Sequence, residues 1–358
     1  MKSHEGEYPN QSEGGMGKSL PRSEPELEEF LSEPPSAVLK TLRDLDSDLV
    51  ILGVGGKMGP TLARMAVRAL EQAGSRWNVY GVSRFGTPGL RDRLESWGVH
   101  TVAADLFEHR SAAVLPDSRN VIYMIGQKFG TSGDAPLTWA ANTYVPSVAA
   151  GRYAGARIVV FSTGNVYPLT PIGGGGSVEG DPLEPVGEYA DSCLGRERLF
   201  EFFSQRQGIR CSTMRLNYAV ELRYGVLVDI ARRVFSGMPV DVSTGMVNVI
   251  WQGDANACAL RLLSHCSIPP FVLNVTGPEM VSVRRAAERF GQLFGLPVTL
   301  AGVERDTALL SNASLSHRMF GYPRVSVDQI IEWTAEWVSR DLPVWEKPTH
   351  YDVRNGRF

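Results

Sequence analysis

Residues 48 to 62 read Asp48-Leu-Val-Ile-Leu-Gly53-Val-Gly-Gly56-Lys57-Met-Gly59-Pro-Thr-Leu62. The apolar run at 49–52 predicts a buried strand, and the stretch at 62–70 predicts a helix. Gly53, Gly56 and Gly59 predict a tight turn between them. Such a turn binds anions, because backbone N–H groups and the helix dipole point at a pyrophosphate that the glycines allow to approach. The stretch therefore predicts a dinucleotide-binding turn; the alternative is a turn that binds nothing.

The composition is that of an ordinary globular protein. The chain has 358 residues and a net charge of −3, which argues against a nucleic-acid or anionic-membrane partner. No apolar run has the length of a transmembrane helix, and the N-terminus has no signal-peptide core. The four cysteines form no CxxC pair and the six histidines form no metal spacing. We therefore expect a cytoplasmic protein without a metal site.

Strands and helices alternate after residue 48. Strands are expected at 49–52, 78–82, 99–103, 120–125, 157–161 and 209–216, and helices at 62–70, 90–97, 136–153 and 187–207. This alternation predicts an α/β fold, a Rossmann-type doubly wound parallel sheet whose ligands bind at the carboxyl ends of the strands. Two short helices are expected in residues 25–44, packed on the outside of this domain, and the loop at 173–176 is expected to be flexible.

The pattern loosens after residue 220 and predicts a small mixed α/β region for substrate. Helices are expected at 226–236, 283–294, 307–320 and 327–338, strands at 247–251 and 271–275, and a helix capped by Asp254 and ending at His265. We divide the chain into a disordered tail (1–24), a helical extension (25–47), a cofactor domain (48–220), a mainly substrate-binding region (221–342) and a C-terminal tail or lid (343–358).

Further motifs follow the glycine turn. Asp105-Leu106 follows the third strand, and the fifth strand runs into Phe161-Ser-Thr163-Gly-Asn165; further on stand Tyr189, Glu197 and Arg215-Leu-Asn217-Tyr218. Together with the Gly-x-x-Gly-x-x-Gly spacing, this set resembles the extended short-chain dehydrogenases, the NAD(P)-dependent epimerase/dehydratase family. The resemblance covers about residues 48–342.

The resemblance implies a role for each matching residue. Tyr189 would be the acid/base and Thr163 would bind a substrate hydroxyl or carbonyl, with position 193 completing the catalytic set. The cofactor would be held by Gly53, Gly56, Lys57, Met58, Gly59, Ser83, Arg84, Asp105, Leu106, Ile125, Gly126 and Asn142. The substrate would be met by Lys128, Asn165, Asn217, Tyr218 and Arg223; a rim ion pair is the alternative for Arg223.

Position 193 departs from the family motif Tyr-x-x-x-Lys. The stretch here is Tyr189-Ala-Asp-Ser-Cys193, and a thiol supplies no positive charge beside the phenol. An unassisted tyrosine has a pKa of about 10 and is a poor base at neutral pH. Three readings remain open: Arg196, on the same helical face, or Lys128 replaces the lysine; Cys193 has a reactive role of its own, which needs a lowered thiol pKa; or the fold binds cofactor without turnover.

The end of the second strand bears on cofactor choice. Ser83-Arg84 stands where an NAD enzyme usually has an acid, and Lys57 adds positive charge, so we expect NADP in preference to NAD. The expected activity is that of an oxidoreductase or epimerase acting on a hydroxyl or keto carbon of a sugar, sugar acid or related polyol. The alternative is a cofactor-binding sensor or scaffold. A homodimer is expected by analogy with the family.

Overall fold

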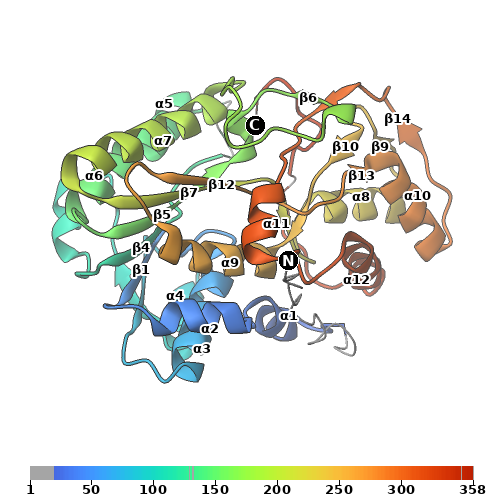
Figure 1. Cartoon of the computed structure of the whole chain (residues 1–358). Coiled ribbons are helices and arrows are strands. Elements are labelled where there is room, and N and C mark those ends of the chain that lie inside the picture. Colours follow the sequence, from blue (N-terminus) through green and yellow to red (C-terminus); the bar gives the residue numbers. More distant parts are fainter. Residues whose placement is uncertain (1–19, 129, 131–132, 348, 358) are drawn as a thin grey trace, which may run out of the picture.

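The computed structural model describes residues 20–128, 130, 133–347 and 349–357. Its centre is a seven-stranded parallel sheet with the strand order β12-β7-β5-β4-β1-β2-β3 (Figure 1). The strands are β1 (Leu49–Leu52), β2 (Val79–Ser83), β3 (His100–Ala103), β4 (Asn120–Tyr123), β5 (Arg157–Thr163), β7 (Arg210–Leu216) and β12 (Phe271–Val275). β1 lies between β2 and β4, so the strand order reverses there, and a ligand crevice opens at such a point. The Rossmann-type prediction is confirmed.

Helices cover both faces of this sheet. Leu49 and Ile51 of β1 pack into one apolar cluster, and Val50 and Leu52 pack into another on the opposite face. The first face is covered by α2 (Ser36–Arg43), α3 (Gly59–Gln72), α4 (Leu90–Ser96) and α9 (Gln252–Arg261). The second is covered by α6 (Val145–Arg152) and α7 (Glu188–Gln207), and η1 (His109–Val114) contacts α6. All four side chains of β1 are fully buried, as expected for a parallel strand covered on both faces.

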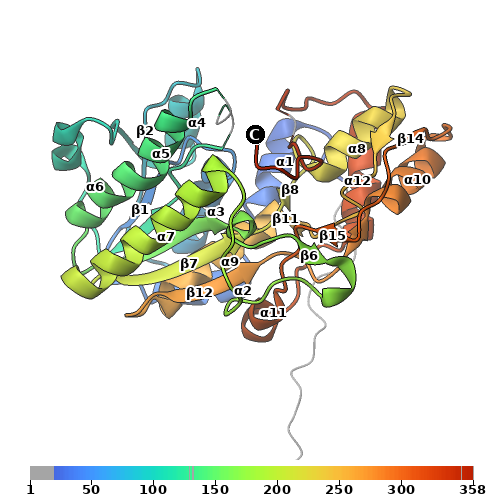
Figure 2. The same cartoon turned by 90° about the horizontal axis from the view of Figure 1, so that it is seen from above.

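A second unit packs beside the sheet (Figure 2). Its main helices are α8 (Val226–Phe235), α10 (Val283–Phe294) and α12 (Val327–Ser339), which share one apolar cluster. The N-terminal helix α1 (Glu24–Leu31) buries Leu27 and Leu31 in the same cluster. Both helices expected on the outside of the cofactor domain contact it. α2 packs in the same apolar cluster as α3 and α9, and Glu29 of α1 pairs with Arg68 of α3 at 2.9 Å, although α1 buries its apolar side chains in the C-terminal unit.

Short elements make the connections. They are α5 (Ala135–Trp139), the π-helix η2 (Ala140–Tyr144), η3 (Gly164–Val166), β6 (Thr170–Pro171), η4 (Ile172–Gly174), β8 (Ala219–Val220), β9 (Val240–Asp241), β10 (Met246–Val247), β11 (Ile250–Trp251), η5 (Leu262–His265), β13 (Val281–Ser282), β14 (Leu300–Ala301), β15 (Thr307–Ala308) and α11 (Ser314–Phe320). β6 pairs with β15, and this pairing anchors the loop that contains residues 173–176.

Three local predictions were wrong. Asp254 does not cap a helix: it lies inside the first turn of α9, and its carboxylate accepts hydrogen bonds from the backbone and side chain of Arg324. The helix expected at 307–320 is shortened to α11, because Thr307–Ala308 pairs with β6 instead. The strand expected at 247–251 is split between β10 and β11, which pair with different partners.

Three further points concern the chain as a whole. β12 lies beyond residue 220 in sequence yet adds to the edge of the cofactor sheet beside β7. Within the described residues, no helix combines the length and apolar character needed to cross a bilayer. The disorder expected at residues 1–24 falls mainly on residues 1–19, outside the described chain.

Candidate functional site

Two adjoining cavities lie at the carboxyl ends of the central strands. The larger has a volume of about 790 Å³ and extends from the glycine turn to Tyr189. The smaller has a volume of about 180 Å³ and continues past Thr163 and Asn217. Their common wall is formed by Lys57, Met58, Lys128, Ser162, Tyr189 and Tyr224. A long groove leading into a small chamber is therefore built where the strand order reverses.

The glycine turn is packed too tightly for side chains. Gly53 has φ +89°, and a Cβ there would lie 2.9 Å from Ile125, two residues after the end of β4. A Cβ on Gly59 would lie 2.3 Å from the carbonyl oxygen of Val54. Gly56 instead faces open space, since its nearest neighbour would be the Gly53 oxygen at 3.4 Å. Two of the glycines thus let strand and helix approach, and Gly56 leaves room for a ligand.

The N-terminus of α3 faces the larger cavity. No side chain caps its first backbone N–H groups, and Met58, the residue before the helix, lines both cavities. Lys57 lines both as well, with its ammonium 3.1 Å from the centre of the Tyr224 ring. Burial, and then repulsion from Lys128 and Lys347, lowers the Lys57 pKa to about 6. An anion bound here would reverse that shift, because it would favour the charged form.

Tyr189 lies in the first turn of α7. Its phenol donates a hydrogen bond to the Cys193 sulfur and receives one from Thr163, at the end of β5. Burial raises the phenol pKa above its ordinary value, and the positive charge of Arg196 opposes that shift. Asn165 donates to Thr163 Oγ1 over 2.9 Å and so fixes the hydroxyl that faces the small cavity.

Arg196 is brought beneath Tyr189 from two turns further along α7. Its side chain is only 5% exposed. Nη1 donates to the Phe161 carbonyl oxygen and Nη2 to Asn142 Oδ1, both over 2.6 Å. Nη2 also lies 3.5 Å from Cys193 Sγ, and Nε has no hydrogen-bond partner within the described chain. A guanidinium remains protonated even when buried, so a permanent positive charge stands next to the catalytic candidates.

Arg196 fits because neighbouring residues leave room for it. A Cβ on Gly126 would lie 2.7 Å from its Nη2. Asn142, in the π-helical turn η2, accepts from the backbone of Gln127 and donates to Ser192, at distances of 3.0 and 2.9 Å. The amide therefore ties the loop after β4 to α7 and orients the guanidinium. π-helical turns of this kind are frequent at functional sites.

Lys128 approaches the same site from the loop after β4. It lines both cavities, and its ammonium lies 5.8 Å from the centre of the Tyr189 ring. Burial lowers its pKa to about 8. Both cations named from the sequence, Lys128 and Arg196, thus reach the surroundings of Tyr189, but only Arg196 keeps its charge irrespective of pH.

Cys193 is fully buried, and burial raises the pKa of its thiol. This is the opposite of the lowered pKa that a reactive cysteine needs. The thiol accepts from Tyr189 and packs against Arg196. The geometry thus gives Cys193 the character of a small uncharged side chain beside the guanidinium.

Glu197 and Arg215, two residues of the motif set, form a buried ion pair. The Arg215 guanidinium donates to both carboxylate oxygens of Glu197, with Nη2 at 2.7 Å. Arg215 Nη1 also donates to the Tyr167 hydroxyl over 2.7 Å. The pair joins α7 to β7 and thereby holds the helix that carries Tyr189 against the sheet.

Arg223 does not reach the small cavity. It is buried among three carboxylates and pairs with Glu24, Glu28 and Glu221 at 3.0–3.2 Å. This corresponds to the ion-pair alternative, although the pair is buried and involves helix α1. Arg223 and Glu28 both line the larger cavity, and Glu28 also forms an ion pair with Arg93 at 3.0 Å.

The end of β2 is more open. Arg84 and Asp105 lie 3.8 Å apart, with 67% and 37% of their side chains exposed. The Ser83 hydroxyl lies against Gly55 and accepts from the backbone of Phe85. None of these side chains lines the two cavities. Their roles toward a cofactor therefore stay predictions.

The structure groups the sequence-derived candidates in three sets. The larger cavity is lined by Gly53, Gly56, Lys57, Met58, Gly126, Lys128, Tyr189 and Arg223. The smaller adds Thr163, Asn165, Asn217 and Tyr218. Outside both linings lie Gly59, Ser83, Arg84, Asp105, Leu106, Ile125, Asn142 and Cys193.

Sequence reasoning missed several residues of the site. Gln252 and Thr349 line the small cavity, and Trp345 lines the large one. Trp345 is held in place by its backbone N–H, which donates to the Arg223 carbonyl oxygen over 2.8 Å. These residues come from the C-terminal third of the chain, and no local motif marks them.

Comparisons with known proteins give the fold. No protein-family model and no curated protein matches the sequence. Among solved structures, MoeE5 in complex with UDP-glucose and NAD matches with a TM-score of 0.66 at 20% identity, covering 82% of this chain and 99% of that one. The UDP-glucuronic acid 4-epimerase from Bacillus cereus with UDP-glucuronic acid and NAD gives 0.68 at 16% identity, with coverages of 82% and 99%. The UDP-glucose 4-epimerase from Thermus thermophilus with NAD gives 0.66 at 19%, with coverages of 81% and 98%.

Proposed function

We propose that this chain is an NAD(P)-dependent oxidoreductase or epimerase of the extended short-chain dehydrogenase type, acting on a hydroxyl or keto carbon of a sugar, sugar acid or related polyol. The observation that carries the proposal is the meeting of Thr163, Tyr189 and Arg196 beside the wall shared by the two cavities. A phenol with a hydroxyl and a buried cation beside it is equipped to exchange a proton with a carbonyl oxygen. The likeness to NAD-bound sugar-nucleotide epimerases supports the same assignment.

The larger cavity suits a nicotinamide dinucleotide. Its volume lies within the roughly 300–1,000 Å³ of ligand pockets. The uncapped N-terminus of α3 and Lys57 would meet the pyrophosphate, and Gly56 leaves room for it. The bound cofactor would supply or accept a hydride at C4 of the nicotinamide.

We favour NADP over NAD because Arg84 follows β2 and carries an exposed guanidinium that can receive a 2′-phosphate. Titration of both oxidised cofactors into the wild type and Arg84→Ala tests this preference. We expect Arg84→Ala to lose NADP affinity while leaving NAD affinity unchanged. Equal losses for both cofactors would mean that Arg84 meets a part they share.

The chain's own residues divide the proton chemistry. The Thr163 hydroxyl binds the substrate oxygen, and Tyr189 gives its proton to that oxygen or takes it away. Arg196 acts as a positioning residue whose charge stabilises the phenolate left after proton donation. Because burial keeps Tyr189 protonated at neutral pH, it is ready to act as the acid, which favours reduction of a keto group.

Cys193 then has a packing role in this scheme. A lysine at this position would compete with Arg196 for the same region, whereas the uncharged thiol lies 3.5 Å from the guanidinium. The raised thiol pKa keeps the sulfur neutral and argues against nucleophilic chemistry.

The rival function is cofactor binding without turnover, and the observation that favours it is the phenol's hydrogen bond to Cys193. Two assays separate the two functions: oxidation of NADPH and NADH at 340 nm across a panel of keto sugars detects net reduction, and NMR of hydroxy sugars incubated with the oxidised cofactors detects epimerisation, which leaves no net absorbance change. We expect turnover, and we expect Tyr189→Phe to lower it at least a hundredfold, the lower end of about 10²–10⁴ for a general acid, with cofactor affinity unchanged. Cofactor binding without turnover would support the rival, and full activity of Tyr189→Phe would refute the role of the tyrosine.

A further inference from the structure

The last described residues, 349–357, are fastened over the small cavity. The Thr349 backbone N–H donates to Asp229 Oδ2 over 2.8 Å, and its hydroxyl donates to the same oxygen over 2.5 Å. Thr244 Oγ1 donates to the Tyr351 carbonyl oxygen over 3.0 Å. Thr349 and Tyr351 are only 3% and 5% exposed. This segment, which we call the tail, is therefore packed as a wall.

The far end of the tail reaches the start of α7. Gly356 and Gly187 touch backbone to backbone: a Cβ on Gly356 would lie 2.1 Å from the Val186 carbonyl oxygen, and one on Gly187 would lie 2.7 Å from the Gly356 oxygen. Between the two ends, the Arg354 guanidinium donates to the carbonyl and hydroxyl oxygens of Thr307, both over 2.6 Å. The tail thus spans from the C-terminal unit to the residues just before Tyr189.

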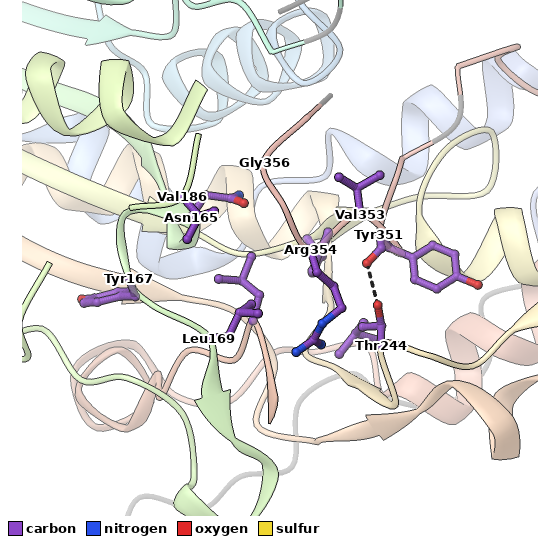
Figure 3. Close-up of a pocket in the computed structure, with 12 residues that line it drawn as sticks. Asn165, Tyr167, Leu169, Val186, Thr244, Tyr351, Val353, Arg354 and Gly356 are labelled. Atoms are coloured by element: carbon purple, nitrogen blue, oxygen red, sulfur yellow. Dashed lines mark hydrogen bonds between the residues drawn. The ribbon is translucent and has the colours of Figure 1, made fainter. Parts of the chain in front are cut away.

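The tail fills the space into which the small cavity would otherwise extend. Asn165 and Tyr218 line both the small cavity and a further hollow of only about 30 Å³. Figure 3 shows Asn165 and Val186 on one side of this hollow and Val353, Arg354 and Gly356 of the tail crossing it. The space on the far side of Asn165 from the small cavity is therefore occupied by residues of the tail.

The remaining chamber is small and has two basic side chains in its lining. Its volume of about 180 Å³ falls below the roughly 300–1,000 Å³ of pockets that bind drug-sized ligands. Lys57 and Lys128 line it, and no described lining residue is an aspartate or a glutamate. Burial disfavours the charged form of both lysines, and a bound anion would restore it.

We propose that the tail is a specificity-determining segment, which excludes nucleotide-linked sugars and restricts the substrate to a small polyol bearing one anionic group. This inference rests on the proposed function, since it concerns the substrate of the same site. A carboxylate or a phosphate could supply the charge, and both are compatible with Lys128, since Lys57 is assigned to the cofactor pyrophosphate. The neighbouring folds are bound to UDP-sugars, so this chain would use a related site for an unlinked substrate.

The test compares the full chain with a chain ending at Lys347 and with the full-length variant Arg354→Ala. Each protein is saturated with cofactor and titrated calorimetrically with UDP-glucose, glucuronate and glucose 6-phosphate. We expect the full chain to bind one of the two small anions and not UDP-glucose. Shortening the chain should raise the affinity for UDP-glucose at least tenfold, and Arg354→Ala should also raise this affinity. Glucuronate and glucose 6-phosphate distinguish the two sources of charge.

Two results would overturn the inference. One is UDP-glucose binding equally tightly to the full and the shortened chains. The other is a shortened chain that is folded and binds cofactor but still excludes UDP-glucose. If the shortened chain does not fold, hydrogen exchange on the full chain in the presence of UDP-glucose replaces it. If UDP-glucose binds and the amides of residues 349–357 become exposed to exchange, the tail is not a fixed wall and the inference is contradicted. If UDP-glucose does not bind and the protection of these amides is unchanged, the inference is supported. Failure of the proposed function would be seen separately, as a full chain that binds cofactor but turns over none of the sugars tested.

Discussion

Replacing Cys193 by lysine restores the family motif in sequence, yet we expect it to destabilise this protein. The Cys193 sulfur is fully buried and lies 3.5 Å from Arg196 Nη2. A lysine here brings a second positive charge against a guanidinium that already has its partners in Phe161 and Asn142. The carboxylate that acts electrostatically on Cys193, Glu197, is engaged by Arg215. The new charge therefore has no carboxylate to neutralise it.

The size of the effect follows from Coulomb's law. Two unit charges about 4 Å apart repel by about 4 kcal/mol at an effective dielectric constant of about 20. The destabilisation has an upper limit, because the lysine can lose its proton and avoid the repulsion. A lysine with an ordinary pKa of about 10.4 becomes neutral at pH 7 at a cost of about 4.6 kcal/mol, at 1.36 kcal/mol per pKa unit. We therefore expect Cys193→Lys to lose about 4 kcal/mol of unfolding free energy at pH 7.

The sign of the pH dependence follows from the same argument. A lysine whose pKa is lowered on folding releases its proton as the chain folds, so the deficit shrinks as pH rises toward the unfolded-state value. Between pH 7 and pH 9 we expect a recovery of up to about 2.7 kcal/mol, two units at 1.36 kcal/mol each. Urea unfolding at both pH values measures it, with the uncharged Cys193→Met as the control for added volume.

The double variant Cys193→Lys with Arg196→Met is the matched test of function. It removes the repulsion and leaves one cation on this side of α7, in addition to Lys128, so we expect stability to return and reductase activity to exceed that of Cys193→Lys alone. If Cys193→Lys is no less stable than Cys193→Met at pH 7, Arg196 does not place its charge at position 193, and the reasoning is refuted.

Three further predictions follow from the cavities and the surface. The pKa of Lys57 is lowered to about 6, and a bound pyrophosphate should raise this pKa again, so cofactor binding should take up a proton at pH 7–8 and weaken as pH rises. Calorimetry in buffers of different ionisation enthalpy should show the proton uptake. Proton uptake that persists in Lys57→Met would contradict the role of Lys57. Gly59→Ala should lower the thermal stability, because its Cβ would lie 2.3 Å from the backbone of Val54. Gly56→Ala should fold normally and lose cofactor affinity at least tenfold. Equal thermal stability of the two variants would contradict the close packing at Gly59. We expect a homodimer through the helices after β4 and β5, where Trp139 and Phe202 are exposed, and light scattering should find Phe202→Glu monomeric; a dimer that persists would place the interface elsewhere.

The sequence by itself determined the fold class and the position of the glycine turn. Both depend on neighbours in the chain: apolar runs predict buried strands, and glycines at fixed spacing predict a turn with room for an anion. The approach of Arg196 to Tyr189 was also predictable, because residues i, i+4 and i+7 share one face of a helix. Local periodicity was sufficient wherever the sequence of a single helix, strand or turn determined the local structure.

Local periodicity failed where distant segments competed for the same groups. Asp254 had the residue type and position of a cap, but its carboxylate is engaged by Arg324 from far along the chain. Residues near 307 were expected to be helical, but a pairing with β6 decided their conformation. Propensity is a weak prior, and such tertiary contacts override it.

Tertiary structure alone decided what surrounds the reacting groups. The hydrogen bonds that hold Arg196 come from β5 and from the π-helical turn, and the tail closes the small cavity through contacts with Thr244, Thr307 and Gly187. None of these contacts joins residues that are close in sequence, so no spacing rule predicts them. The sequence could determine the position of the glycine turn and place Tyr189 at the start of a helix, because those are properties of single segments. The charge beside the tyrosine and the size of the chamber depend on how several segments pack, and only the folded chain defines that packing.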